Sequence, residues 1–168
     1  MKNNNYLFRV LFTLLTAAFV GLILLNSSLD SQHSSQMSGG VLQFLQNLTA
    51  SFGWETGLTE HIIRKTAHFL EYFALGVLLF ATIRSYSVQP GRHLFLGLFL
   101  GLIVPVCDEY LQTQIPGRSG EPVDILLDFA GVAVGTAVFF LVLWLHRRRH
   151  PLSGGGRLLP YRTPVIKP

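Results

Sequence analysis

The feature that most constrains this chain is a set of four apolar stretches, each close to the length of a membrane-spanning helix. The stretches cover residues 7–25, 66–83, 94–107 and 125–145. A helix needs roughly 20 mostly apolar residues to cross a bilayer. The third stretch reaches that length only if its helix continues to about Tyr110 or begins before His93. The sequence therefore predicts an all-α, polytopic membrane protein with four transmembrane helices in a small bundle.

The composition supports this class. The 168 residues are 49% hydrophobic and only 13% charged, whereas about a quarter of the residues of a soluble domain are charged. The basic residues flank the apolar stretches and do not alternate with aromatic residues, so the pattern argues against a nucleic-acid partner. Cys107 is the single cysteine, which excludes an internal disulfide.

The first apolar stretch has a second interpretation, a cleaved signal peptide. Lys2 and Arg9 supply the positive charge that such a peptide needs. However, no small-x-small cleavage site follows within residues 24–28, and the stretch is long for the apolar part of a signal peptide. We therefore expect residues 1–25 to remain as an N-terminal transmembrane helix.

The basic residues also predict the orientation, because cytoplasmic loops of membrane proteins are enriched in Lys and Arg. If the N-terminus is cytoplasmic, all but three of the 13 Lys and Arg residues lie on the cytoplasmic side. The exceptions are Arg64, Lys65 and Arg118. Both termini are thus predicted to be cytoplasmic. All nine acids then fall in the outer segments or in the outer halves of helices, which places the polar chemistry on the extracytoplasmic side.

The remaining segments complete the predicted organisation. Residues 26–65 form an extracytoplasmic loop in which apolar residues recur with helical spacing over 41–48. That short helix lies on the membrane surface in one interpretation and caps the bundle in the other. Residues 66–145 form a three-helix core. Residues 146–168 form a basic cytoplasmic tail, which is expected to be disordered because it is rich in Gly and Pro.

Three sets of polar residues are predicted to meet at the outer side of this core. Ionisable residues in membrane helices are costly and usually face the bundle interior or mark a functional site. The first set is Arg64, Lys65, His68 and Glu71, the second is Asp108, Glu109 and Gln112, and the third is Arg118, Asp124 and Asp128. Two pairs of glycines, Gly97 with Gly101 and Gly131 with Gly135, have the spacing that lets helices pack closely.

The polar sets allow several kinds of site. Arg64, Lys65 and Arg118 could hold an anionic head group, and the same cations could instead neutralise the acids in a purely structural network. For catalysis, His68 would be the acid–base residue, with Glu71, Asp108 or Glu109 orienting it or activating water. His, Asp and Glu are also metal ligands. No His-x-x-x-His or similarly tight spacing is present, so neither a metal nor another cofactor is expected.

Together these residues resemble a known family. The pattern consists of Lys65-x-x-His68, Glu71-Tyr72, Leu75-Gly76, Asp108-Glu109-x-x-Gln112, Pro116-Gly117-Arg118-Ser119, Asp124 and Gly131-x-x-x-Gly135. In this order, over about residues 64–145, it is similar to the VanZ-like family. The resemblance implies a small multi-pass protein of the bacterial cell envelope, in the plasma or inner membrane. The family is named for a protein that lowers susceptibility to the glycopeptide antibiotic teicoplanin.

Three functions follow as hypotheses. The first is a membrane protein that binds an anionic lipid or a lipid-linked envelope precursor through its outward-facing polar residues. The second is an enzyme that acts on a lipid head group at the outer leaflet. The third is a small transporter, which is less favoured because the inner halves of the helices carry no polar pathway. Membrane lipids are the expected partners, and a homo-oligomer is left open.

Overall fold

The computed structural model describes residues 2–28, 31–51, 57–115 and 120–149, and in these residues all regular structure is helical. The elements are α1 (Lys2–Ser27), α2 (Ser31–Ala50), α3 (Glu60–Tyr86), the short 3-10 helix η1 (Pro90–His93), α4 (Leu94–Thr113) and α5 (Pro122–Arg149). Four of the helices, α1, α3, α4 with η1, and α5, are long and apolar enough to cross a membrane. The predicted all-α membrane fold is confirmed, while the direction in which it is inserted stays a prediction.

The helices extend beyond the apolar stretches because local signals set their ends. Thr59 caps α3, and its side-chain oxygen accepts a hydrogen bond from the backbone N–H of Ile62. This helix therefore starts six residues before the apolar stretch. Helix α4 continues to Thr113, which supplies the length that the third stretch lacked. Helix α5 begins at Pro122, a residue favoured in the first turn, and continues through the basic residues to Arg149.

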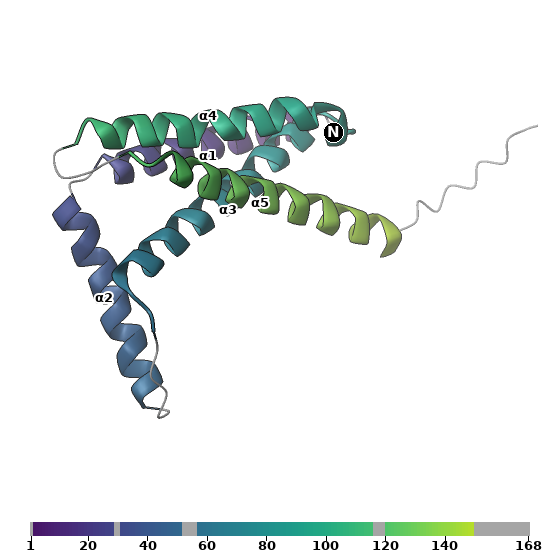
Figure 1. Ribbon diagram of the computed structural model, residues 1–168. Coiled ribbons are helices and arrows are strands. Elements are labelled where there is room, and N and C mark those ends of the chain that lie inside the picture. Colours follow the sequence, from purple (N-terminus) through teal and green to yellow (C-terminus); the bar gives the residue numbers. More distant parts are fainter. Residues whose placement is uncertain (1, 29–30, 52–56, 116–119, 150–168) are drawn as a thin grey trace, which may run out of the picture.

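Helix α3 is the centre of the bundle. It packs most extensively against α5 and also contacts α1, α2 and α4. In Figure 1, α1 and α4 run side by side, α5 crosses α3, and α2 projects from the bundle next to the start of α3. Helix α2 includes the segment 41–48 for which a short helix was predicted, and is much longer than that segment.

Glycines allow the closest approach, which occurs between α3 and α5. A Cβ atom added at Gly131 would lie 2.6 Å from the carbonyl oxygen of Phe69, so the two backbones touch there without an intervening side chain. The glycines of α4 make room for side chains instead, because a Cβ at Gly101 would lie 2.6 Å from Cγ1 of Val132. Both predicted glycine pairs are thus packing devices.

The core of the bundle is small. Tyr72, Leu75, Phe80 and Val132 are fully or almost fully buried, while many large apolar side chains, such as Phe95, remain exposed on the outside. A soluble protein rarely leaves so much apolar surface open. In this protein the lipid covers that surface, so the interior needs to hold only the contacts that fix the helices relative to one another.

Candidate functional site

The described residues of the three polar sets lie at one end of the bundle, where α1 and α4 end and α3 and α5 begin. We call this the polar end. At the other end, called the basic end, Nε of Arg9 donates a hydrogen bond to the carbonyl oxygen of Ser85, and the Arg9 guanidinium lies over the ring of Tyr86. The two ends differ in where their charges lie, since among the described residues the buried acids are all at the polar end.

The first turns of α3 present cations and a histidine on different sides of the helix. Lys65 faces α5, where its ammonium is paired with Asp124 and lies 3.8 Å from a carboxylate oxygen of Glu121. Arg64 and His68 face α1 and α2. The division follows from helical geometry, because adjacent residues on a helix point about 100° apart.

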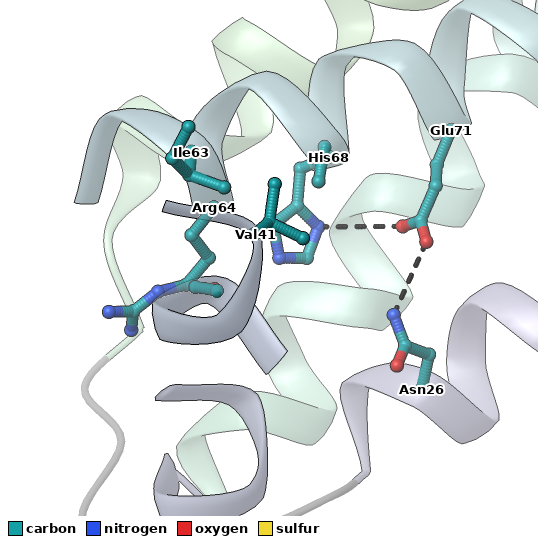
Figure 2. A pocket seen from close by; sticks show the side chains of 8 residues that line it. Asn26, Val41, Ile63, Arg64, His68 and Glu71 are labelled. Atoms are coloured by element: carbon teal, nitrogen blue, oxygen red, sulfur yellow. Dashed lines mark hydrogen bonds and ion pairs between the residues drawn. The ribbon is translucent and has the colours of Figure 1, made fainter. Parts of the chain in front are cut away.

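Glu71 continues the face that carries Arg64 and His68. One of its carboxylate oxygens accepts a hydrogen bond from Nδ2 of Asn26 at 3.2 Å, and the other lies 3.9 Å from Nδ1 of His68. Figure 2 shows both contacts, which join the end of α1 to the first half of α3.

The polar residues of α4 have two different roles. Asp108 and Gln112 share a face, as their spacing predicted, and Nε2 of Gln112 donates to Oδ2 of Asp108 at 3.3 Å and to Oγ of Ser27 at 3.0 Å. Glu109 faces α5, and its Oε1 accepts a hydrogen bond from the backbone N–H of Glu121. Glu109 therefore holds the start of α5 in place, a structural contact that sequence spacing did not indicate.

Asp128 completes the site from α5. It is 3% exposed and Asp108 is 0% exposed. One ring nitrogen of His68 and one carboxylate oxygen of each aspartate lie within 4.8 Å of one another. We call His68, Asp108 and Asp128 the three-helix cluster, because α3, α4 and α5 contribute one residue each.

An open pocket adjoins this cluster on the side of α1 and α2. It encloses about 530 Å³ including its open mouth, and we call it the lateral pocket. Its lining comprises Asn26, Ser38, Val41, Ile63, Arg64, Ala67, His68 and Glu71. In Figure 2 the Arg64 guanidinium extends to the side away from His68 and Glu71, so that a cation lies at one rim and a polar wall at the other.

Most of the predicted site residues are thus brought together, and some contributors were missed. Arg118 lies outside the described residues. Asn26 and Ser27 were not predicted as site residues, although these polar residues follow the first apolar stretch and reach Glu71 and Gln112. Tyr72, which is fully buried beside Asp108, was not assigned a role either. Only the change from apolar to polar residues at Asn26 signalled that α1 contributes to the site.

The comparison with known proteins extends the resemblance to the N-terminal half. No curated protein and no solved structure matches the chain significantly. The model of the VanZ/LLP1 family matches residues 12–144, which includes most of α1 and all of α2 in addition to the three-helix core. Because this match covers most of the chain and includes all the described polar residues of the site, the chain belongs to the VanZ/LLP1 family.

Proposed function

We propose that this VanZ/LLP1-family protein binds the head group of an anionic lipid, or of a lipid-linked envelope precursor, in the lateral pocket. The observation that supports this most directly is the position of Arg64 at the rim of an open pocket between α2 and α3. The site would lie at the outer leaflet of a bacterial plasma or inner membrane.

The chemistry of Arg64 suits an anionic group. Its Nε is buried and makes no hydrogen bond with any residue that the structure describes. A guanidinium donates several hydrogen bonds in a planar fork that matches phosphate oxygens. A buried donor that lacks a partner is costly, and a phosphate at the rim would supply that partner.

The rest of the pocket suits the part of a lipid just below its head group. Val41 of α2 and Ile63 and Ala67 of α3 contribute apolar surface next to the polar side chains. A water-soluble anion would gain nothing from this surface. A lipid gains from both parts, since its phosphate would contact Arg64 and its first methylenes would contact the apolar lining.

Lys65 has a different role in this proposal from the one that the sequence suggested. Its ammonium is already paired with Asp124 and lies near Glu121, so that it joins α3 to α5 and is not available to a head group. The proposal therefore depends on Arg64, with Asn26 and His68 as hydrogen-bonding groups on the polar wall.

The distribution of charge supports an outward-facing pocket. Arg9, Arg84 and Arg92 belong to the basic end, as do the three arginines that close α5. By the positive-inside rule this end faces the cytoplasm. The lateral pocket, at the opposite end, would then open at the height of the outer head groups.

A direct binding measurement tests the proposal. Purified protein in nanodiscs is titrated with phosphatidylglycerol, a polyprenyl phosphate and, as a neutral reference, phosphatidylcholine, and bound lipid is counted by native mass spectrometry. We expect preference for the anionic lipids, and Arg64→Gln should weaken their binding about 10-fold or more, as loss of a charge-assisted hydrogen bond predicts. The matched control, Arg84→Gln, removes a cation at the basic end and should leave the preference unchanged.

Equal affinity of wild type and Arg64→Gln for every anionic lipid would contradict the proposal. The same experiment tests the second candidate, an enzyme that acts on the head group. That candidate is favoured by His68, which lines the lateral pocket with Nδ1 3.9 Å from Glu71, a suitable pairing for acid–base chemistry. Lipid turnover that is lost in His68→Ala would establish the enzyme and replace simple binding. An effect on susceptibility to glycopeptides would be a consequence of either activity.

A further inference from the structure

The three-helix cluster presents a combination of groups that lipid binding does not use. His68, Asp108 and Asp128 come from three different helices, and one ligand atom of each lies within 4.8 Å of the other two. The aspartates are almost completely buried. Such a convergence of a histidine and two carboxylates inside a bundle is typical of a cation site.

No direct ion pair balances the negative charge of the cluster. Within the described residues no lysine or arginine forms an ion pair with Asp108 or Asp128, and Lys65, the cation next to the cluster, is paired with Asp124 and near Glu121. Burial of charges without a direct partner is strongly unfavourable. Two neighbouring buried carboxylates therefore require either a bound cation or a shared proton.

The two carboxylate oxygens of Asp108 have different surroundings. Oδ2 accepts a hydrogen bond from Nε2 of Gln112, whereas Oδ1 is buried and accepts no hydrogen bond of normal geometry from a described residue. The buried Tyr72 hydroxyl is next to this carboxylate. A carboxylate that is oriented by a hydrogen bond on one oxygen is arranged like a metal ligand with an outer-sphere partner.

We propose that His68, Asp108 and Asp128 bind a divalent transition-metal ion such as Zn²⁺ or Mn²⁺. One imidazole nitrogen and two carboxylate oxygens suit these ions better than Mg²⁺ or Ca²⁺, which prefer oxygen donors alone. With bonds of about 2.0–2.2 Å at tetrahedral or octahedral angles, donors on a common ion lie about 3.0–3.6 Å apart. Because the three atoms lie within 4.8 Å of one another, the side chains need to move inward by about 1 Å or a little more to bind.

The surroundings of the cluster support this assignment. A small cavity adjoins the cluster and is lined by Lys65, His68, Gln112, Asp124 and Asp128. Gln112 is held in turn by Ser27, so the orientation of Asp108 is fixed from α1. His68 also borders the lateral pocket, which brings the proposed ion close to that pocket, although the ion does not require a lipid to bind.

The test measures metal binding to the full chain without lipid. Protein purified without a histidine tag and stripped with a chelator is titrated with Mn²⁺ and Zn²⁺ by calorimetry, and bound metal is counted by mass spectrometry. We expect about one ion per chain. Asp108→Asn and Asp128→Asn should each weaken binding at least about 10-fold, in line with losses at metal sites. Glu121→Gln, the matched control, removes an exposed acid of the same end outside the cluster and should bind as wild type does.

A second measurement can be made on the wild-type protein alone, in case the variants do not fold. Pulsed electron paramagnetic resonance of bound Mn²⁺ should show coupling to a histidine nitrogen, and where His68→Ala folds, that variant should lack the coupling. Absence of stoichiometric binding, unchanged affinity in a folded Asp108→Asn protein, or no nitrogen coupling would each overturn the proposal and leave a proton shared by the two aspartates as the explanation. Arg64→Gln separates the two proposals, because it should weaken lipid binding and leave the metal in place.

Discussion

The two faces of α3 are built in opposite ways. Toward α5, Gly131 and Gly135 remove side chains from the interface, so that backbone meets backbone. Toward α1 and α2, Ile23 of α1 belongs to the same apolar cluster as Tyr72 and Leu75. Polar side chains such as Thr16 and Thr82 also meet there, and the interface opens into the lateral pocket at the polar end. One face is closed over most of its length, while the other is partly hollow.

The two faces of α3 therefore suit different roles, one as a rigid interface and the other as an adjustable wall of the pocket. A backbone-to-backbone contact tolerates almost no change of shape, because protein interiors are close-packed and a single added methyl group is felt. It therefore keeps the backbones that carry His68 of α3 and Asp128 of α5 at a fixed separation. A face made of side-chain contacts can adjust more easily, and this face borders the pocket in which we propose that a lipid binds. Substitutions on each face test this difference.

The largest effect is expected at the closed face. Gly131→Ala places a methyl group 2.6 Å from the carbonyl oxygen of Phe69, so the helices must separate. We expect the free energy of unfolding to fall by about 1–3 kcal/mol, the usual cost of overpacking. The measurement is thermal unfolding in detergent, followed by circular dichroism.

Gly21→Ala is the control for this prediction. A Cβ at Gly21 meets nothing within 4 Å, and alanine favours helix over glycine by up to about 1 kcal/mol. This variant should be as stable as wild type or slightly more so. If Gly131→Ala unfolds at the same temperature as Gly21→Ala, the closed face is not as rigid as the structure indicates.

A smaller effect is expected where the same face carries its ion pair. Lys65→Met removes the cation that pairs with Asp124 and lies near Glu121. The side chains of Lys65 and Asp124 are each about a quarter exposed. Because solvent screens such a pair, we expect the free energy of unfolding to fall by about 1 kcal/mol. This is the upper end of the range for exposed ion pairs and less than the cost of breaking a buried one. Thermal unfolding of Lys65→Met, Asp124→Leu and the double variant gives the coupling directly. Additive losses would show that the two residues do not stabilise each other.

The smallest effect is expected at the face toward α1. Thr16→Val removes the 2.7 Å hydrogen bond to the Thr82 hydroxyl while keeping the shape of the side chain. Hydrogen bonds between membrane helices contribute about 0.6 kcal/mol on average. A coupling energy of that size between Thr16→Val and Thr82→Val in a double-mutant cycle would show that the face toward α1 stabilises the protein less than the face toward α5. If Thr16→Val lowered the free energy of unfolding more than Gly131→Ala does, the α1 contact would be the more important one.

Much of the fold was predictable because a helix that crosses a lipid bilayer must be long and apolar, and both properties can be read from the sequence. Four apolar stretches of spanning length predicted four helices, and the glycine spacings predicted where helices approach closely. Helix ends were predicted less well. Hydropathy detects only the part of a helix that is apolar, whereas α3 begins at a capping threonine in a polar segment and α5 continues into its arginines.

The site was predictable as a group but not as a set of contacts. Spacing on one helix correctly paired Asp108 with Gln112. It could not show that Lys65 turns toward Asp124 while its neighbour Arg64 faces the lateral pocket, because that depends on which helix lies on each side of α3. Asn26 was overlooked for the same reason, since the change from apolar to polar residues at Asn26 does not indicate that the end of α1 reaches Glu71.

The sequence by itself thus determined the class of protein, the number of membrane helices and the end of the bundle at which the polar residues gather. These depend on hydrophobicity and on periodicity along one chain segment, and both are local properties. Only the tertiary structure decided which polar groups pair, which remain without a partner, and that His68, Asp108 and Asp128 meet. Those outcomes depend on the rotation of each helix about its own axis. For α3 and α5 that rotation is set by the packing of glycines in α5 against the backbone of α3, a contact between two segments that lie far apart in the sequence.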